Sequence, residues 1–151
     1  MKIVFDERGS DIMAKVNIIY WSGTGNTERM AEAIKGGLES EAEVKLLSVS
    51  DATTKDVEEA EVLILGCPSM GDEVLEEGEM ESFVDSISNI VKGKKVGLFG
   101  SYGWGDGQWM RDWEERMESY GAEIKVESLI HQGEPDDSTL EECKNFPQKL
   151  I

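Results

Sequence analysis

The chain has 151 residues, with 32 acidic and 15 basic side chains, so its formal net charge is −17. A charge of this sign is repelled by nucleic acids and anionic membranes and favours basic protein partners. Hydrophobic residues make up 39% of the chain, which is enough for the core of one domain. No apolar run approaches the roughly 20 residues of a membrane span, and no secretory signal is visible. These features predict a cytoplasmic protein with a single domain.

Residues 1–12 have no helical or strand period, and Met13-Ala14-Lys15 resembles a natural start. We therefore expect 1–12 to be a leader or an expression scar, followed by one domain at 13–151. Two cysteines, Cys67 and Cys143, do not form a disulfide framework, and they have no zinc spacing with His131. No metal site is expected.

After the leader, short β-branched or aromatic runs alternate with segments of helical spacing. Strands are expected at 16–20, 44–49, 62–65, 96–99 and 124–130, and helices at 27–38, 80–91, 108–120 and 138–150. The run at 62–65 is apolar throughout, which is typical of a strand buried on both faces. The alternation predicts an α/β protein with a parallel sheet between helical layers. Pro147 falls inside the last expected helix and should shorten or kink it.

In an open parallel sheet, ligands bind outside the carboxyl ends of the strands. The first loop there reads Ser22-Gly23-Thr24-Gly25-Asn26-Thr27 and leads directly from a strand into a helix. Glycines let backbone N–H groups turn inward, hydroxyls add donors, and a helix start favours an anion. The loop lacks the lysine of a Walker A motif, and Glu28 occupies the third glycine position of a dinucleotide fingerprint. We expect a cradle for a phosphate monoester; the alternative is an ordinary turn in which Thr27 caps the helix.

Two further loops follow strands at the same expected edge. The loop at 100–107 places Tyr102 and Trp104 among four glycines. Such a ring can lie flat against a planar ligand; the alternative is a ring folded onto the core. The loop at 66–73 supplies the thioether of Met70 and a glycine, Gly71, whose peptide reorients at low cost. Packing of Met70 in the core is the alternative there.

Together these loops resemble those of the flavodoxins, small FMN-binding electron carriers, and of the short-chain clostridial type in particular. The resemblance lies in segments 20–27, 65–73 and 99–107 and extends from Val16 to the C-terminus. It implies a three-layer, doubly wound fold with a five-stranded parallel sheet in the order 2-1-3-4-5 and FMN at the switch point. It also implies an electron-transfer protein rather than an enzyme.

The resemblance implies a role for each matching residue. The FMN phosphate would be held by the loop N–H groups and by Ser22, Gly23, Thr24, Gly25, Asn26 and Thr27. Further contacts would come from Ser69, Ser101, Tyr102, Gly103 and Gly105. Trp104 and Met70 would cover the two faces of the flavin. On reduction, the Gly71–Asp72 peptide would flip to accept a hydrogen bond from flavin N5, which stabilises the neutral semiquinone, and Glu73 would accept from N3.

Acidic residues concentrate next to this site. Six acids fall in ten residues, at Asp72, Glu73, Glu76, Glu77, Glu79 and Glu81, and no Lys or Arg occurs from 56 to 91. Most of these carboxylates are expected to form a solvated face. Those near the flavin edge should dock a basic partner and oppose the arrival of a second electron.

The expected function is a low-potential one-electron carrier with non-covalent FMN, cycling mainly between semiquinone and hydroquinone. One alternative is an FMN-dependent NAD(P)H:quinone reductase, although the loops are short and the acidic rim would repel NADPH. Another is a non-redox receiver or assembly module, although the first strand ends in Tyr20-Trp21-Ser22 instead of an acidic phospho-acceptor. The resemblance implies a monomer whose partners are a flavodoxin reductase, an oxoacid oxidoreductase, a hydrogenase or a nitrogenase.

Overall fold

The structure is a computed structural model that describes residues 3–5 and 11–151. Its strands are β1 (Ile3–Phe5), β2 (Asp11–Met13), β3 (Lys15–Tyr20), β4 (Glu43–Ser48), β5 (Val62–Gly66), β6 (Lys95–Tyr102) and β7 (Leu129–Gln132). Its α-helices are α1 (Asn26–Gly36), α2 (Thr54–Glu59), α3 (Met80–Ser86), α4 (Gln108–Ser119) and α5 (Asp137–Asn145). Two 3₁₀ turns are η1 (Val49–Asp51) and η2 (Phe146–Lys149).

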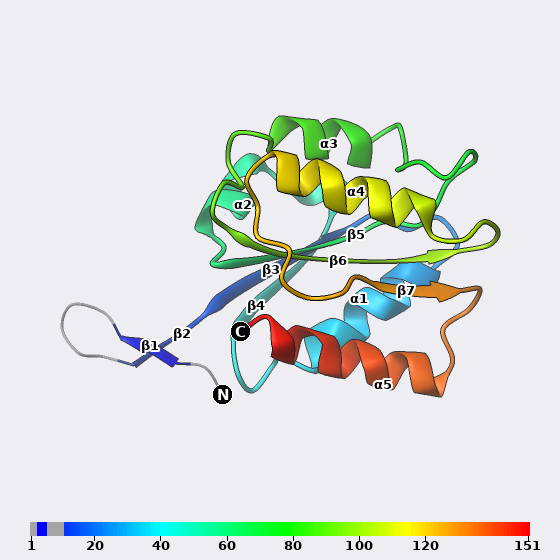
Figure 1. Cartoon of the computed structure of the whole chain (residues 1–151). Helices are drawn as coiled ribbons and strands as arrows, with labels where there is room; N and C mark the ends of the chain where they lie inside the picture. Colours follow the sequence, from blue (N-terminus) through cyan, green and yellow to red (C-terminus); the bar gives the residue numbers. More distant parts are fainter. Residues whose placement is uncertain (1–2, 6–10) are drawn as a thin grey trace.

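Five strands form one parallel sheet in the order β4-β3-β5-β6-β7. Helices α1 and α5 cover one face, and α2, α3 and α4 cover the other (Figure 1). Numbered along the chain within this sheet, the order is 2-1-3-4-5, so the predicted fold class is confirmed. Tyr20, Gly66 and Phe99 lie side by side in register on β3, β5 and β6. The loops that follow these strands therefore emerge at one edge.

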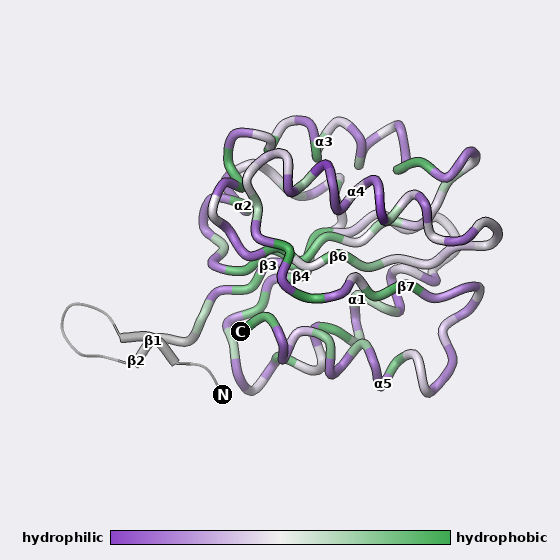
Figure 2. The backbone as a smooth tube through the Cα atoms, viewed as in Figure 1, coloured by the Kyte–Doolittle hydropathy of each residue, from purple (hydrophilic) through white to green (hydrophobic). Residues whose placement is uncertain are grey.

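The core lies on both faces of the central strands. Every residue of β5 is buried, as its continuous apolar run predicts. In Figure 2 hydrophobic stretches run along the central strands β3 and β6, whereas the surrounding loops are largely hydrophilic. Trp109 and Trp113 of α4 are buried on one side of the sheet, and Phe146 and Leu150 on the other. Burial of large side chains on both faces holds the strand ends, and thus the loops, in fixed positions.

Several helices differ from the expected ones. Helix α2 was not predicted, because its six residues are too few to show a period. It is stabilised by a capping box in which the Asp56 carboxylate accepts from the Thr53 N–H at 2.8 Å. The helix expected at 80–91 ends at Ser86. The last α-helix ends at Asn145 and continues as a 3₁₀ turn that contains Pro147, so the predicted shortening is confirmed.

The prediction of a strand at 124–130 was wrong, because the last strand of the sheet, β7, runs from Leu129 to Gln132. Glu123 is still linked to β6, since its carbonyl accepts from the Val96 N–H at 3.0 Å. The chain then leaves the sheet, and it pairs with β6 again only from Leu129, opposite Phe99. The pattern of apolar residues in 124–130 reflects partial burial against both cores and does not reflect continuous pairing.

A short antiparallel hairpin precedes the sheet. Its strands β1 and β2 pair with Ile3 opposite Met13, and it extends away from the rest of the fold (Figure 1). The lack of a strand period in this segment therefore did not exclude strand pairing. Residues 1–2 and 6–10 lie outside the described residues, and the interpretation of 1–12 as a leader stays a prediction. In the described part of the chain, no helix has the length and apolar character needed to cross a membrane.

Candidate functional site

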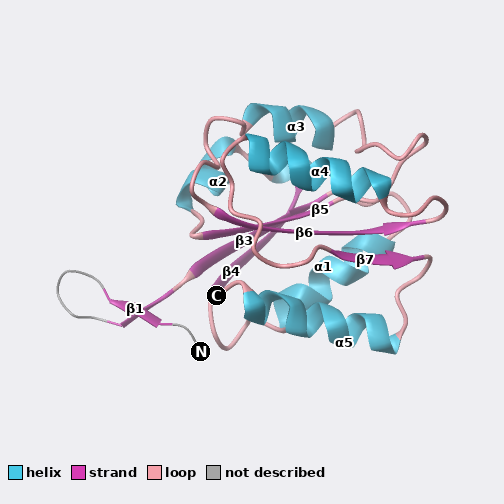
Figure 3. Cartoon of the chain, viewed as in Figure 1, coloured by secondary structure: helices cyan, strands magenta, loops and turns pink. Residues whose placement is uncertain are grey.

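The loops that follow β3, β5, β6 and β7 are joined by backbone hydrogen bonds. The Trp21 N–H donates to the Gly66 carbonyl at 3.0 Å, and the Ser69 N–H donates to the Ser101 carbonyl at 3.0 Å. The Gly133 N–H donates to the Tyr102 carbonyl at 2.9 Å. These loops gather at the edge of the sheet to which the arrowheads of β6 and β7 point (Figure 3). Four loops, one more than the sequence predicted, meet at the expected ligand-binding edge.

The first loop presents backbone donors at the start of α1. Its Ser22 hydroxyl accepts from the N–H groups of Gly25 and Glu28, at 3.1 and 3.3 Å. Gly25 precedes the helix with φ +100°, a conformation that favours glycine. Among the residues described, four peptide N–H groups have no protein acceptor, those of Gly23, Thr24, Asn26 and Thr27. Such donors at a helix start suit a phosphate group.

Thr27 connects this loop to the loop after β6. The helix is capped by Gly25, so the alternative in which Thr27 is the cap is wrong. Thr27 is instead the second residue of α1, and its buried hydroxyl lies 3.2 Å from that of Ser101. The hydroxyl pair holds the two loops together beneath the surface.

A cavity of about 260 Å³ opens between these loops. Eight predicted residues line it: Gly23, Thr24, Asn26, Ser69, Met70, Ser101, Tyr102 and Gly103. Three lining residues were missed: Trp21, Pro68 and Gly133. Trp21 and Pro68 stand inside the motifs and could have been included. No local signal identifies Gly133, because its position depends on the pairing of β7 with β6.

The turn after β5 is closed at both ends. The Met70 N–H donates to the Val74 carbonyl at 2.9 Å, and the Val74 N–H donates to the Met70 carbonyl at 3.1 Å. Between them Gly71 has φ +40° and Glu73 has φ +58°, and Glu73 is the only non-glycine residue with positive φ in the described part of the chain. Within that part, neither the Gly71 carbonyl nor the Asp72 N–H has a protein partner. The Gly71–Asp72 peptide can therefore rotate without breaking a protein hydrogen bond.

A second cavity of about 420 Å³ lies on the other side of this turn. Its lining residues are Trp21, Met70, Gly71, Asp72, Val74, Glu76, Glu77 and Gly78. Trp21 and Met70 line both cavities. The Glu76 carboxylate accepts from backbone N–H groups at the start of α3, including that of Met80 at 2.9 Å. Asp72 and Glu77 are exposed and give this cavity a negative rim.

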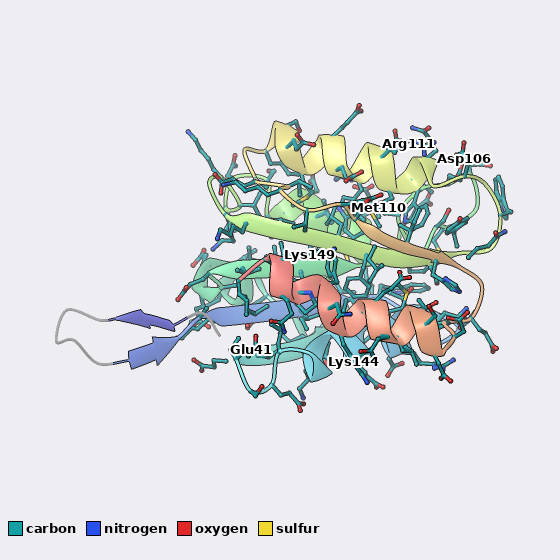
Figure 4. All side chains as sticks on the ribbon, turned by 60° about the horizontal axis from the view of Figure 1, so that its bottom comes forward. Glu41, Asp106, Met110, Arg111, Lys144 and Lys149 are labelled. Atoms are coloured by element: carbon teal, nitrogen blue, oxygen red, sulfur yellow. The ribbon has the colours of Figure 1, made fainter. Side chains whose placement is uncertain are left out.

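Glu73 has a structural partner that the sequence did not indicate. Its Oε1 accepts from the N–H groups of Gly107 and Gln108, at 3.3 and 3.1 Å, at the start of α4. Glu73 thus ties the turn to the glycine-rich loop at 100–107. In the same region the Asp106 carboxylate and the Arg111 guanidinium lie 2.9 Å apart (Figure 4).

Not every predicted residue lines the two cavities. Six do not: Ser22, Gly25, Thr27, Glu73, Trp104 and Gly105. Trp104 is 61% exposed on the loop after β6. Tyr102, in contrast, packs its ring 5.4 Å from that of Trp109, whose indole N–H donates to the Cys67 carbonyl at 3.2 Å. Trp104 is therefore an exposed side chain outside both cavities.

Thiol and metal chemistry have no support at this edge. Cys67 is buried below the turn, and burial raises the pKa of its thiol to about 12. Such a thiol stays protonated and is a poor nucleophile. Cys67 and Cys143 are both free. Among residues 3–5 and 11–151, no group of His, Cys, Asp and Glu side chains is arranged to hold a metal ion.

The flavodoxin family model matches residues 18–146. The chain belongs to the flavodoxin family. It is 54% identical to a flavodoxin of Clostridium beijerinckii, with 89% of this chain and 98% of that protein covered. It is 45% identical to a flavodoxin of Megasphaera elsdenii, with coverages of 87% and 94%. These relatives support the short-chain type.

Solved flavodoxin structures have the same fold. The two-electron reduced flavodoxin of Megasphaera elsdenii superposes with a TM-score of 0.76 at 42% identity, covering 85% of this chain and 97% of that one. A flavodoxin from the domain Archaea superposes with a TM-score of 0.82 at 31% identity, with coverages of 90% and 95%. As a flavodoxin, the chain is an FMN-binding electron carrier and not an enzyme, and its partners are oxidoreductases. The neutral donor loop beside an aromatic-lined cavity fits this cofactor.

Proposed function

We propose that the chain is a low-potential carrier of single electrons, cycling its non-covalently bound FMN mainly between semiquinone and hydroquinone. The observation that carries the proposal is the Gly71–Asp72 peptide, whose C=O and N–H have no partner among the described residues. FMN supplies an isoalloxazine ring that accepts electrons one at a time. The residues of this chain would hold that ring and tune its reduction potential.

The phosphate would be held by uncharged donors. Four peptide N–H groups of the first loop have no protein acceptor among the residues described, and the hydroxyl of Thr24 is exposed beside them. Ser22 would contribute indirectly, because its hydroxyl accepts from the N–H groups of Gly25 and Glu28 and so orders the loop. Holding the phosphate without a lysine keeps the site from stabilising further negative charge.

The turn would respond to the redox state. The reciprocal hydrogen bonds between Met70 and Val74 fix its ends, so reorientation is confined to the three residues between them. Gly71 has no atom within 4 Å of the position where a Cβ would stand. A rotated peptide would point the Gly71 carbonyl at the ring as an acceptor for a proton on N5. Met70 would cover one face of the ring and Trp104 the other.

Charge would set the low potential and the choice of partner. Asp72 and Glu77 lie on the rim of the second cavity and are exposed. One unit charge about 10 Å away in water disfavours an added electron by about 0.4 kcal/mol, so several carboxylates act together. The same carboxylates would dock a basic surface on a flavodoxin reductase, an oxoacid oxidoreductase, a hydrogenase or a nitrogenase, with the carrier acting as a monomer.

Stepwise anaerobic reduction, followed by the visible spectrum, tests the proposal. A yellow protein that turns blue at half reduction and then pale has two separated one-electron steps and a neutral intermediate. Direct bleaching with no blue stage would contradict it.

A variant pair localises the effect to the turn. Gly71→Thr should lower the yield of the blue form, because a β-branched residue resists positive φ. Gly93→Thr is the matched control, since Gly93 has φ +77° and equally open space around its Cβ position but lies far from the site. A loss of blue form in both variants, or in neither, would argue against the role of this turn.

A further inference from the structure

The segment that carries Trp104 is fastened to the protein at both of its ends. On the N-terminal side, the Tyr102 carbonyl accepts from the Gly133 N–H at 2.9 Å. On the C-terminal side, the Arg111 guanidinium donates to the carbonyl and the carboxylate of Asp106, at 3.1 and 2.9 Å. These hydrogen bonds fix the ends of the segment, and the residues between them must be held separately.

Residues 103–105 have a single backbone hydrogen bond. Within the part of the chain that the structure describes, the Gly103 carbonyl is their one backbone N–H or C=O group with a protein partner. The Gln132 side chain donates to this carbonyl from Nε2 at 3.2 Å. The Gly103 carbonyl and the Trp104 N–H belong to the same planar peptide. Holding the carbonyl therefore fixes the orientation of the peptide from which Trp104 departs.

The glycines on either side of Trp104 increase the importance of this hydrogen bond. Gly103 has no atom within 4 Å of the position where a Cβ would stand, and Gly105 has φ +88°. Glycine has more backbone freedom than any other residue. Trp104 itself is 61% exposed, so burial of its side chain does little to fix its backbone. Without Gln132, the Gly103–Trp104 peptide would rotate without breaking a protein hydrogen bond.

The pairing of β6 with β7 places Gln132 at this carbonyl. Gln132 is the last residue of β7 and lies opposite Tyr102, the last residue of β6. Gly103 follows Tyr102 directly, so a glutamine side chain from the end of β7 reaches the first peptide beyond β6. A slip of one residue in the register would turn this side chain to the other face of the sheet.

We propose that Gln132 is a positioning residue for FMN binding and acts through Trp104. It holds the Gly103–Trp104 peptide so that the indole is presented to the flavin with a smaller loss of conformational entropy on binding. Gln132 lines neither of the two cavities of the site, so its effect on the flavin is indirect. This inference rests on the proposed function, in which Trp104 covers one face of the ring.

Backbone order in the apoprotein gives the first test. Gln132→Met keeps an unbranched, uncharged side chain of similar length but removes the donor. ¹⁵N relaxation should give lower order parameters for the Trp104 and Gly105 amides in this variant than in the wild type. Gln148→Met is the matched control, because Gln148 is also exposed and its Nε2 donates to a backbone carbonyl, that of Gly37 at the end of α1. The control should leave the order parameters of Trp104 and Gly105 unchanged.

FMN binding then tests whether Gln132 acts through the indole. Gln132→Met should raise the Kd for FMN, by no more than the roughly 2- to 10-fold expected of Trp104→Ala, because it disturbs only the placement of the same ring. In a Trp104→Ala background, Gln132→Met should change the Kd little further, since two residues that act as a unit are not additive. Gln148→Met should leave the Kd unchanged in both backgrounds.

Three outcomes would overturn the inference. The first is unchanged order at Trp104 in Gln132→Met, and the second is an unchanged Kd for FMN in that variant. The third is an equal rise in Kd with and without the Trp104 indole. Failure of the proposed function is recognised separately, because Trp104→Ala alone would then leave the Kd unchanged or stepwise reduction would show no blue stage.

Discussion

Replacing Thr27 by valine tests how the phosphate loop is held and what it binds. The Thr27 hydroxyl lies 3.2 Å from the Ser101 hydroxyl, and these side chains are only 1% and 5% exposed. Valine has nearly the same shape, so the packing of α1 against the sheet is retained. The change removes one hydroxyl and leaves that of Ser101 without its partner.

The substitution should have two separate effects, one on the stability of the apoprotein and one on FMN binding. Loss of the hydrogen bond, with a buried hydroxyl left unpaired, should lower the free energy of unfolding of the apoprotein by about 1–3 kcal/mol. The resemblance also gives this hydroxyl a hydrogen bond to the charged phosphate, which would add about 1.5–3 kcal/mol to binding. That second loss corresponds to roughly a 10- to 150-fold increase in Kd for FMN.

Flavin fluorescence measures the second effect when FMN and riboflavin are compared. The Kd for FMN should rise in Thr27→Val, whereas the Kd for riboflavin, which has no phosphate, should change little. Thr139→Val is the control, because it also removes a buried hydroxyl. The Thr139 hydroxyl, on α5, donates to the carboxylate of Asp136, the residue before that helix, at 2.8 Å. The control should lose stability and keep its preference for FMN. Equal weakening of both flavins by Thr27→Val would refute the phosphate contact.

Three further changes have defined outcomes. Trp104→Ala should leave the stability of the apoprotein unchanged, because the side chain is 61% exposed. It should weaken FMN binding by roughly 2- to 10-fold through lost stacking and raise the hydroquinone potential, as measured by flavin titration and potentiometry; an unchanged potential would mean that the indole does not stack. Glu73→Gln keeps an acceptor but removes a charge from the start of α4, so thermal denaturation should show a loss of about 0.3–1 kcal/mol, and Glu73→Ala a larger one. Asp56→Asn should cost about 1–2 kcal/mol at neutral pH, because the Asp56 carboxylate accepts from Lys45 and from the cap of α2. The hydrogen bond from Lys45, and then that from the Thr53 backbone, hold the pKa of Asp56 below its usual 3.8, so this stability is present above pH 3.8 and lost as the pH falls through the lowered value. Urea denaturation of both proteins across that range should therefore show the difference shrinking with acid, and a difference independent of pH would exclude the ion pair as its source.

Local sequence patterns were sufficient for β3, β4, β5 and β6 and for the longer helices, but not for β7. The apolar run at 62–65 is buried on both faces as β5, and the helical spacing of Trp109 and Trp113 corresponds to the buried face of α4. Burial of one face is a local property with a fixed period, so these elements can be recognised without a partner. Helix α2 was missed because six residues show no period, and its stability comes from the Thr53 and Asp56 cap and from Lys45 on a neighbouring strand.

The sequence alone also indicated where the site is. Glycines and hydroxyls directly after a strand predict an anion-binding loop, and Met70 and Gly71 lie beside it, on the turn after β5. The side-chain partners within the site could not be predicted in the same way. Three of these hydrogen bonds join segments far apart in the chain. They link Glu73 to the start of α4, Thr27 to Ser101, and Gly133 to Tyr102.

The sequence by itself determined the α/β class, the strand positions near the site and the types of group in each loop, because these depend on the period and chemistry of neighbouring residues. Only the tertiary structure decided which groups share a cavity, which carboxylates are occupied by backbone N–H groups, and that the Trp113 N–H is left unpaired. These partners depend on the register of β3, β5, β6 and β7. That register is a property of the whole sheet and not of neighbouring residues.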